Sequence, residues 1–165
     1  MDNLFQELGN TLEKIQGVFQ ELLRITMEKQ KQLVLGNIQE IERLTHEEEG
    51  LVFSAGSLEN ERYKLARQLI NDFQLQEGAT LTDIIQVAPE AEKSRLQLLQ
   101  EDMRKLADKI DKVNQENILL IEQSLKFINF TVDVLTGPEG LDTYDTELDK
   151  GSKRENISRI LDKKI

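Results

Sequence analysis

One row of residues in the C-terminal half of the chain constrains the fold more than any other feature. Between Leu96 and Val134, mostly apolar residues recur at alternating steps of three and four, and no proline interrupts them. This 3.5-residue repeat keeps its side chains on one side of an α-helix. Because a lone helix with an apolar seam is unstable in water, this first row must pack against other helices. Its members are Leu96, Leu99, Met103, Leu106, Ile110, Val113, Asn117, Leu120, Ser124, Phe127, Thr131 and Val134.

A second apolar row begins one residue along from the first. A straight helix drifts by about 20° per heptad against a 3.5-residue repeat, which explains part of this shift. Drift does not explain why Leu119, Phe127 and Phe130 make most of the circumference apolar as well. Two interpretations stay open: this end is buried between the other helices, or it presents an apolar surface to a partner. The second row contains Ile118, Ile121, Leu125, Ile128, Val132 and Leu135.

The N-terminal part of the chain is predicted to form a long amphipathic helix from Asp2 to Leu35. Gly36 ends it, because glycine accepts the left-handed conformation that closes a helix. Asn37 is the expected N-cap of the next helix, with Glu40 as its partner in a capping box. We expect a sharp reversal of the chain here, with a kink as the alternative. The buried face is expected to contain Leu4, Leu8, Leu12, Ile15, Phe19 and Leu22, widened by Phe5, Leu23 and Met27.

The second helix is predicted to run from Ile38 to about Gln76. Its seam includes the charged residues Glu48 and Arg62, and Gly50 and Gly56 each weaken it by about 1 kcal/mol relative to alanine. We therefore expect the middle of this helix to be poorly packed or mobile. The seam reads Ile38, Ile41, Thr45, Glu48, Val52, Ala55, Leu58, Arg62, Leu65, Leu69 and Phe73.

A short helix is expected from Thr82 to Val87, capped by Thr80 or Thr82. A long third helix should begin at Pro89, where the missing N–H of proline is tolerated, and end at Thr136. At 1.5 Å per residue this helix is roughly 70 Å long. The predicted fold class is therefore all-α: an elongated antiparallel bundle or coiled coil of three long helices. We expect residues 1–136 to form the helical domain and residues 137–165 to form a flexible tail, whose last turns could form a short amphipathic helix on contact with a partner.

The composition argues against enzymatic chemistry. There is no cysteine, and the one histidine, His46, lies four residues after Glu42. A di-iron bundle needs several histidines in Glu-x-x-His pairs, so both the count and the spacing are wrong. The sequence has no glycine-rich phosphate loop and no catalytic constellation of Ser, His and Asp. We expect no catalytic residues, no cofactor and no metal site.

Charge and hydropathy limit the partners. A net charge of −10 disfavours a nucleic acid bound through its phosphates. No segment approaches the ~18 apolar residues needed to span a bilayer, and the N-terminus lacks the features of a signal peptide. We expect a soluble intracellular protein without membrane insertion.

Several segments, in their order along the chain, resemble FlgN-type flagellar export chaperones. The clearest is NQENILLIEQSLKFINFTVDVL, from Asn114 to Leu135. An earlier stretch, EKQKQLVLGNIQEIERLTHEEEGL from Glu28 to Leu51, and the pentapeptide LENER from Leu58 to Arg62 also resemble the family. So does the Tyr144-Asp145 pair.

This resemblance implies a cytoplasmic chaperone that binds the two hook–filament junction proteins through their amphipathic terminal helices. It would keep them soluble and deliver them to the type III export gate, with Tyr144 as the docking residue. The alternative is a structural coiled-coil protein that only self-associates, and a homodimer of the unliganded chaperone is also left open. Family position assigns substrate binding to Leu119, Leu120, Leu125, Ile128, Val132 and Leu135.

Overall fold

The computed structural model describes residues 2–137, and these residues form helices without any β-strand. The helices are α1 (Asp2–Leu35), α2 (Ile38–Asp72), α3 (Leu81–Gln86) and α4 (Glu90–Thr136). Three long helices and one short one pack together, which confirms the all-α bundle expected from the sequence. The predicted bounds of α1 and the predicted end of α4 agree with the structure.

The chain divides into two units, Met1–Glu122 and Gln123–Ile165. Helix α4 runs through the boundary, and residues 123–137 are the described part of the second unit. The predicted tail, its terminal helix near residues 156–165 and Tyr144 lie outside the described residues, apart from Gly137.

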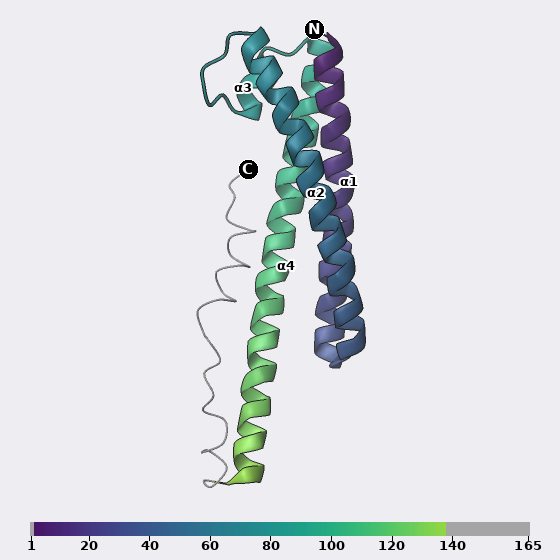
Figure 1. Cartoon of the computed structure of the whole chain (residues 1–165), viewed down its shortest axis with the longest axis vertical. Coiled ribbons are helices and arrows are strands. Elements are labelled where there is room, and N and C mark those ends of the chain that lie inside the picture. The colour runs from purple at the N-terminus through teal and green to yellow at the C-terminus, as the bar shows by residue number, and fades with distance from the viewer. Residues whose placement is uncertain (1, 138–165) are drawn as a thin grey trace. The chain divides into compact units, whose positions relative to one another are not determined.

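The chain reverses sharply between α1 and α2, which lie side by side in Figure 1. Gly36 has φ +68°, and its N–H donates to the carbonyl oxygen of Leu33 (3.3 Å). The N–H of Asn37 donates to the carbonyl oxygen of Gln32 (3.0 Å), which completes a Schellman motif. Far from the turn, the Thr11 hydroxyl of α1 donates a hydrogen bond to Glu61 Oε1 of α2 (3.1 Å). This contact confirms that α1 and α2 are antiparallel. The prediction of a turn is therefore correct, and the kink is excluded.

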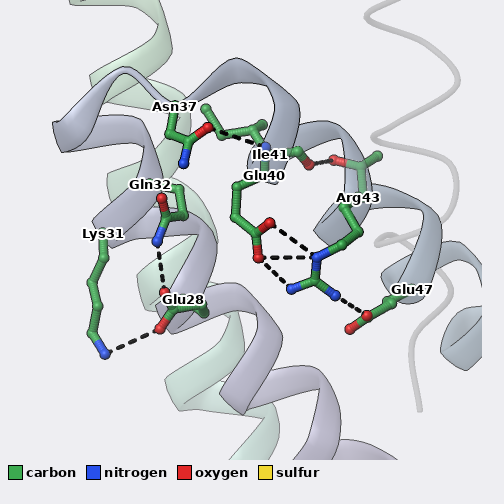
Figure 2. Close-up of polar contacts among 9 residues, drawn as sticks. Glu28, Lys31, Gln32, Asn37, Glu40, Ile41, Arg43 and Glu47 are labelled. Atoms are coloured by element: carbon green, nitrogen blue, oxygen red, sulfur yellow. Dashed lines mark hydrogen bonds and ion pairs between the residues drawn. The ribbon is translucent and has the colours of Figure 1, made fainter.

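The capping box expected at the start of α2 is only half formed. The Asn37 side chain accepts a hydrogen bond from the Glu40 N–H at 3.4 Å, as predicted. The Glu40 carboxylate, however, bonds to Arg43 and not to the backbone of Asn37 (Figure 2). The reason is that the Asn37 N–H is already occupied by the carbonyl oxygen of Gln32 in the Schellman motif.

Helix α2 ends four residues earlier than predicted, at Asp72. The cause is Gln74, which adopts a left-handed conformation (φ +52°) without being glycine. The N–H of Leu75 donates to the carbonyl oxygen of Ile70 (2.9 Å), so this end is also a Schellman motif. Ile70 and Leu75 both pack against the core, and the burial of these apolar side chains favours the turn.

Thr80 caps α3, which settles the choice between Thr80 and Thr82. The Thr80 side chain accepts from the Asp83 N–H (3.4 Å), and Asp83 Oδ2 accepts from the Thr80 N–H (2.7 Å). This complete capping box fixes the orientation of the short helix. Its two central residues, Ile84 and Ile85, are buried.

The hydrophobic core lies where the start of α1, the end of α2, α3 and the start of α4 meet (Figure 1). Phe5 and Phe73 make an edge-to-face contact there, with ring centroids 5.4 Å apart. The buried core residues are Phe5, Leu8, Leu12, Ile15, Leu65, Ala66, Leu69, Ile84, Ile85, Ala88, Leu96 and Leu99. Near the α1–α2 turn the bundle has far fewer buried side chains, chiefly Ile25, Thr26, Leu44 and Asn117.

The seam predicted for α2 needs three corrections, the first being that Val52 is exposed. Ile38 is exposed because it directly follows the turn, while Leu44, which was not predicted, is completely buried. Between Leu44 and Leu65 no side chain of α2 is fully buried, in agreement with the weak packing expected for this stretch. Glu48 is accommodated in the seam because it forms an ion pair with Lys29 of α1, with Nζ and Oε2 2.6 Å apart.

Candidate functional site

The second apolar row of α4 is exposed over its whole length. Within the second unit, its members Leu125, Ile128, Val132 and Leu135 have exposed fractions between 48% and 79%. Within the first unit, Ile118 and Ile121 of the same row are also exposed. Of the two interpretations of this segment, an apolar surface is the one that fits these side chains. Only Glu122, Lys126 and Asp133 are charged between Glu122 and Thr136, so the surface has little polar cover.

The six predicted substrate-binding residues do not all share one face of α4. Leu125, Ile128, Val132 and Leu135 line up along the second row. Since successive helical residues turn by about 100°, Leu119 lies roughly 150° around the helix from the centre of this row. Leu119 is exposed there, whereas Leu120 belongs to the first row and is half-buried. The predicted residues thus surround α4 and do not form a single stripe.

The first row changes character along α4. Leu96 and Leu99 are buried in the core, and the next four members of the row, from Met103 to Val113, are half-buried. Asn117 is buried and donates from Nδ2 to the carbonyl oxygen of Thr26 on α1 (3.0 Å). Beyond this contact, Phe127 and Val134 are exposed, although the repeat itself continues. The apolar pattern therefore serves the bundle core at one end and the protein surface at the other.

A groove lies between the end of α1 and α4 within the first unit. It has a volume of about 500 Å³ and is lined by Gln30, Lys31, Val34, Leu35 and Leu120. Gln30 also reaches α4 directly, since its Nε2 donates to Glu116 Oε2 (2.8 Å). The sequence did not predict that Val34 and Leu35 would line a groove, because apolar residues are ordinary in the last turn of an amphipathic helix. Their exposure is the signal that only the structure provides.

The charged side chains at the α1–α2 turn pair with one another (Figure 2). Lys31 Nζ lies 3.1 Å from Glu28, and Arg43 binds both Glu40 and Glu47. Hydrogen bonds from Gln32 and then Lys31 lower the pKa of the Glu28 carboxyl, and a hydrogen bond from Arg43 lowers the pKa of Glu40. These carboxylates therefore stay ionised and neutralised within the hairpin.

The described residues do not gather the groups that metal chemistry needs. Within residues 2–137, no three His, Asp or Glu side chains lie close enough together to hold a metal ion. His46 is exposed, with Nδ1 3.4 Å from Glu49 on its own helix. No helix in this part of the chain has the length and apolar character required to cross a membrane. What the arrangement offers is apolar surface, suited to burying a second polypeptide.

Comparison with known proteins shows which family the chain resembles. The family model described as "FlgN protein" matches residues 1–148. The chain is also 25% identical, over 146 residues, to a protein of Bacillus subtilis (strain 168) called "Uncharacterized protein YvyG". That match covers 86% of this chain and 89% of the Bacillus protein. No solved structure matches the chain.

The match to the FlgN family includes all four helices and therefore both the apolar rows and the groove. It agrees with the segments that resemble this family in the sequence. The chain belongs to the FlgN family of flagellar export chaperones.

Proposed function

We propose that this protein is a cytoplasmic chaperone for the hook–filament junction proteins and that it binds their amphipathic terminal helices through α4. The observation that carries the proposal is the exposed second row, in particular Leu125, Ile128, Val132 and Leu135. A partner helix with apolar residues three and four apart would cover this row and remove it from water. Covering one half-exposed Leu or Ile contributes about 1 kcal/mol.

Leu119 and Leu120 belong to the same proposed surface but on other sides of the helix. A client that contacts all six predicted residues has to wrap around α4. This suits a substrate that presents more than one helical segment, since each segment would cover one apolar side. The net charge of −10 would keep such a complex soluble while the client awaits export.

Delivery to the type III export gate is the second half of the proposal. It rests on the family and on Tyr144, which lies outside the described residues. The prediction is that Tyr144→Ala leaves client binding intact but reduces the secretion of junction proteins by living cells. Loss of client binding by this variant would contradict a docking role.

The first test measures the binding of a synthetic peptide that covers the C-terminal helix of a junction protein. Calorimetry with the full chain should detect a complex at micromolar concentrations. Ile128→Asp and Val132→Asp should each weaken it roughly tenfold or more, because the new carboxylate loses its water on binding. Both side chains are exposed, so the helical circular dichroism should not change.

Gln97→Asp is the matched control, because it introduces the same charge at an exposed position of α4 far along the helix from the proposed surface. It should bind the peptide like the wild type. Absence of any binding by the wild-type chain would refute the chaperone proposal. An obligate oligomer that excludes the peptide would favour the self-associating coiled coil instead.

A further inference from the structure

The turn between α1 and α2 exposes an unusual concentration of large apolar side chains. Val34, Leu35 and Ile38 are 70%, 73% and 77% exposed. Two of them, Val34 and Leu35, line the groove that Leu120 of α4 closes from the other side. We propose that this groove is a second client-binding site, in which the end of α1 and Leu120 together hold an amphipathic helix. The inference rests on the proposed function and adds a part of the molecule that the apolar rows of α4 do not include.

The turn itself does not need these apolar residues. A Schellman motif is commonly accompanied by apolar residues at its two ends, and at the end of α2 these residues are Ile70 and Leu75, which both pack against the core. In the α1–α2 turn the equivalent residues are Gln32 and Asn37, which are both polar. Local structure therefore gives no reason for Val34 and Leu35, and a role in binding does.

The two walls of the groove are held at a fixed spacing. Asn117 of α4 bonds to the backbone of Thr26 (3.0 Å), and Glu116 bonds to Gln30 (2.8 Å). Gln30 lies four residues before Val34 on α1, and Glu116 and Asn117 lie four and three residues before Leu120 on α4. A groove with walls positioned in advance binds a helix at lower entropic cost than a mobile surface does.

The charged side chains near the groove favour one kind of partner helix. Lys31 and Arg43 are already paired with glutamates of the hairpin (Figure 2). Glu116 differs, because the partner described for it is the neutral amide of Gln30. A helix with Lys or Arg beside its apolar face would complement Glu116, whereas a second copy of a chain with net charge −10 would meet repulsion. The helix that we expect in the groove is therefore an amphipathic client helix with Lys or Arg beside its apolar face.

The location can be tested directly, because the chain has no cysteine and a single introduced one takes a label uniquely. An environment-sensitive fluorophore is attached to Leu35→Cys and, as the control, to Phe53→Cys. Phe53 is 81% exposed in the middle of α2 and does not line the groove. Addition of the junction-protein peptide should shift the emission of the label at position 35 to the blue and leave position 53 unchanged. No shift at position 35, or equal shifts at both, would overturn the inference.

The number of bound peptides gives an independent measurement. The double variant Val34→Gln/Leu35→Gln should lose the peptide in the groove, so a calorimetric titration should give fewer bound peptides per chain than for the wild type, with unchanged circular dichroism. Phe53→Gln should bind like the wild type. If Ile128→Asp abolishes binding while the double variant binds normally, the chaperone proposal stands and the groove is not part of the site. If the wild type binds no peptide, the proposed function itself fails.

Two further arms test the chemistry of the occupant. Peptides with the same apolar residues but Lys or Glu flanks should differ in affinity, with the Lys form tighter, and Glu116→Gln should remove most of that difference. Equal affinities for the wild type would overturn the basic flank. Sedimentation without peptide should show a monomer; a dimer that Val34→Gln/Leu35→Gln dissociates would mean that the groove serves self-association.

Discussion

The side-chain amide of Asn117 donates a hydrogen bond to the backbone carbonyl oxygen of Thr26, and both residues are buried between α1 and α4. Asn117 is only 4% exposed although it occupies a position of the apolar row. The Thr26 hydroxyl bonds within its own helix, to the carbonyl oxygen of Leu22 (2.7 Å). In the described part of the chain, Asn117 Oδ1 is buried without a hydrogen-bond partner. A polar residue in such a seam commonly fixes the register of the helices and lowers stability.

Substitutions at Asn117 should separate these two effects. Asn117→Leu is expected to change the free energy of unfolding by less than about 1 kcal/mol, because the lost hydrogen bond is offset by removal of an unsatisfied oxygen. Asn117→Asp should lower it by about 3 kcal/mol, since a carboxylate would face the Thr26 carbonyl oxygen without water. Urea denaturation measures both values. A severe loss of stability in Asn117→Leu would show that the hydrogen bond dominates.

Glycines in the turn and in the middle of α2 should respond to alanine in opposite directions. Gly36 has φ +68°, so Gly36→Ala should lower the free energy of unfolding by about 1 kcal/mol through backbone strain. No atom lies within 4 Å of the added Cβ, and a clash therefore contributes nothing. Gly50→Ala is the control, because Gly50 is helical with equally open space, and it should raise stability by about 0.5–1 kcal/mol. Equal shifts in denaturation midpoint would contradict this account.

The ion pair between Lys29 and Glu48 should contribute more than ion pairs on the surface do. Its side chains are 16% and 21% exposed, and it connects α1 to the weakly packed middle of α2. A double-mutant cycle with Lys29→Met and Glu48→Gln is expected to give a coupling energy of about 1–2 kcal/mol. The exposed pair Glu101–Lys105 on α4 is the comparison and should give about 0.3–0.5 kcal/mol. Equal values for the two pairs would mean that burial adds nothing here.

Protonation of Asp83 should weaken the start of α3. The Thr80 N–H and hydroxyl both donate to its carboxylate, and they lower the pKa of Asp83 below its ordinary value. The stabilisation is therefore complete above an unfolded pKa of about 3.9 and is lost as the pH falls through the lower folded pKa. An NMR titration of Asp83 should show this low midpoint, and Thr80→Ala should raise it toward the ordinary value. Because Thr80→Ala removes the hydroxyl but keeps the backbone N–H, the midpoint should rise only part of the way, and an unchanged midpoint would refute a contribution of the hydroxyl.

The sequence predicted most of the helical architecture because the deciding signals are local. Gly36 ends α1, Thr80 begins α3, and the 3.5-residue repeat of α4 is written in consecutive residues. These signals depend on backbone conformation and on spacing along one helix. They do not require knowledge of what lies opposite.

The end of α2 is a feature that local sequence signals do not predict. Gln74 has no intrinsic preference for a left-handed conformation, and it adopts one because Leu75 packs against the core. Glu48 and Asn117 likewise take positions that their own residue types do not predict, since each bonds to a side chain or a carbonyl oxygen on another helix.

The candidate site divides in the same way. The sequence by itself determined that the last part of α4 carries more apolar residues than one seam requires. Only the tertiary structure decided that the second row is exposed and that Val34, Leu35 and Leu120 form one groove. The physical reason is that periodicity specifies which side chains share a face of a helix, whereas burial depends on which other helix covers that face.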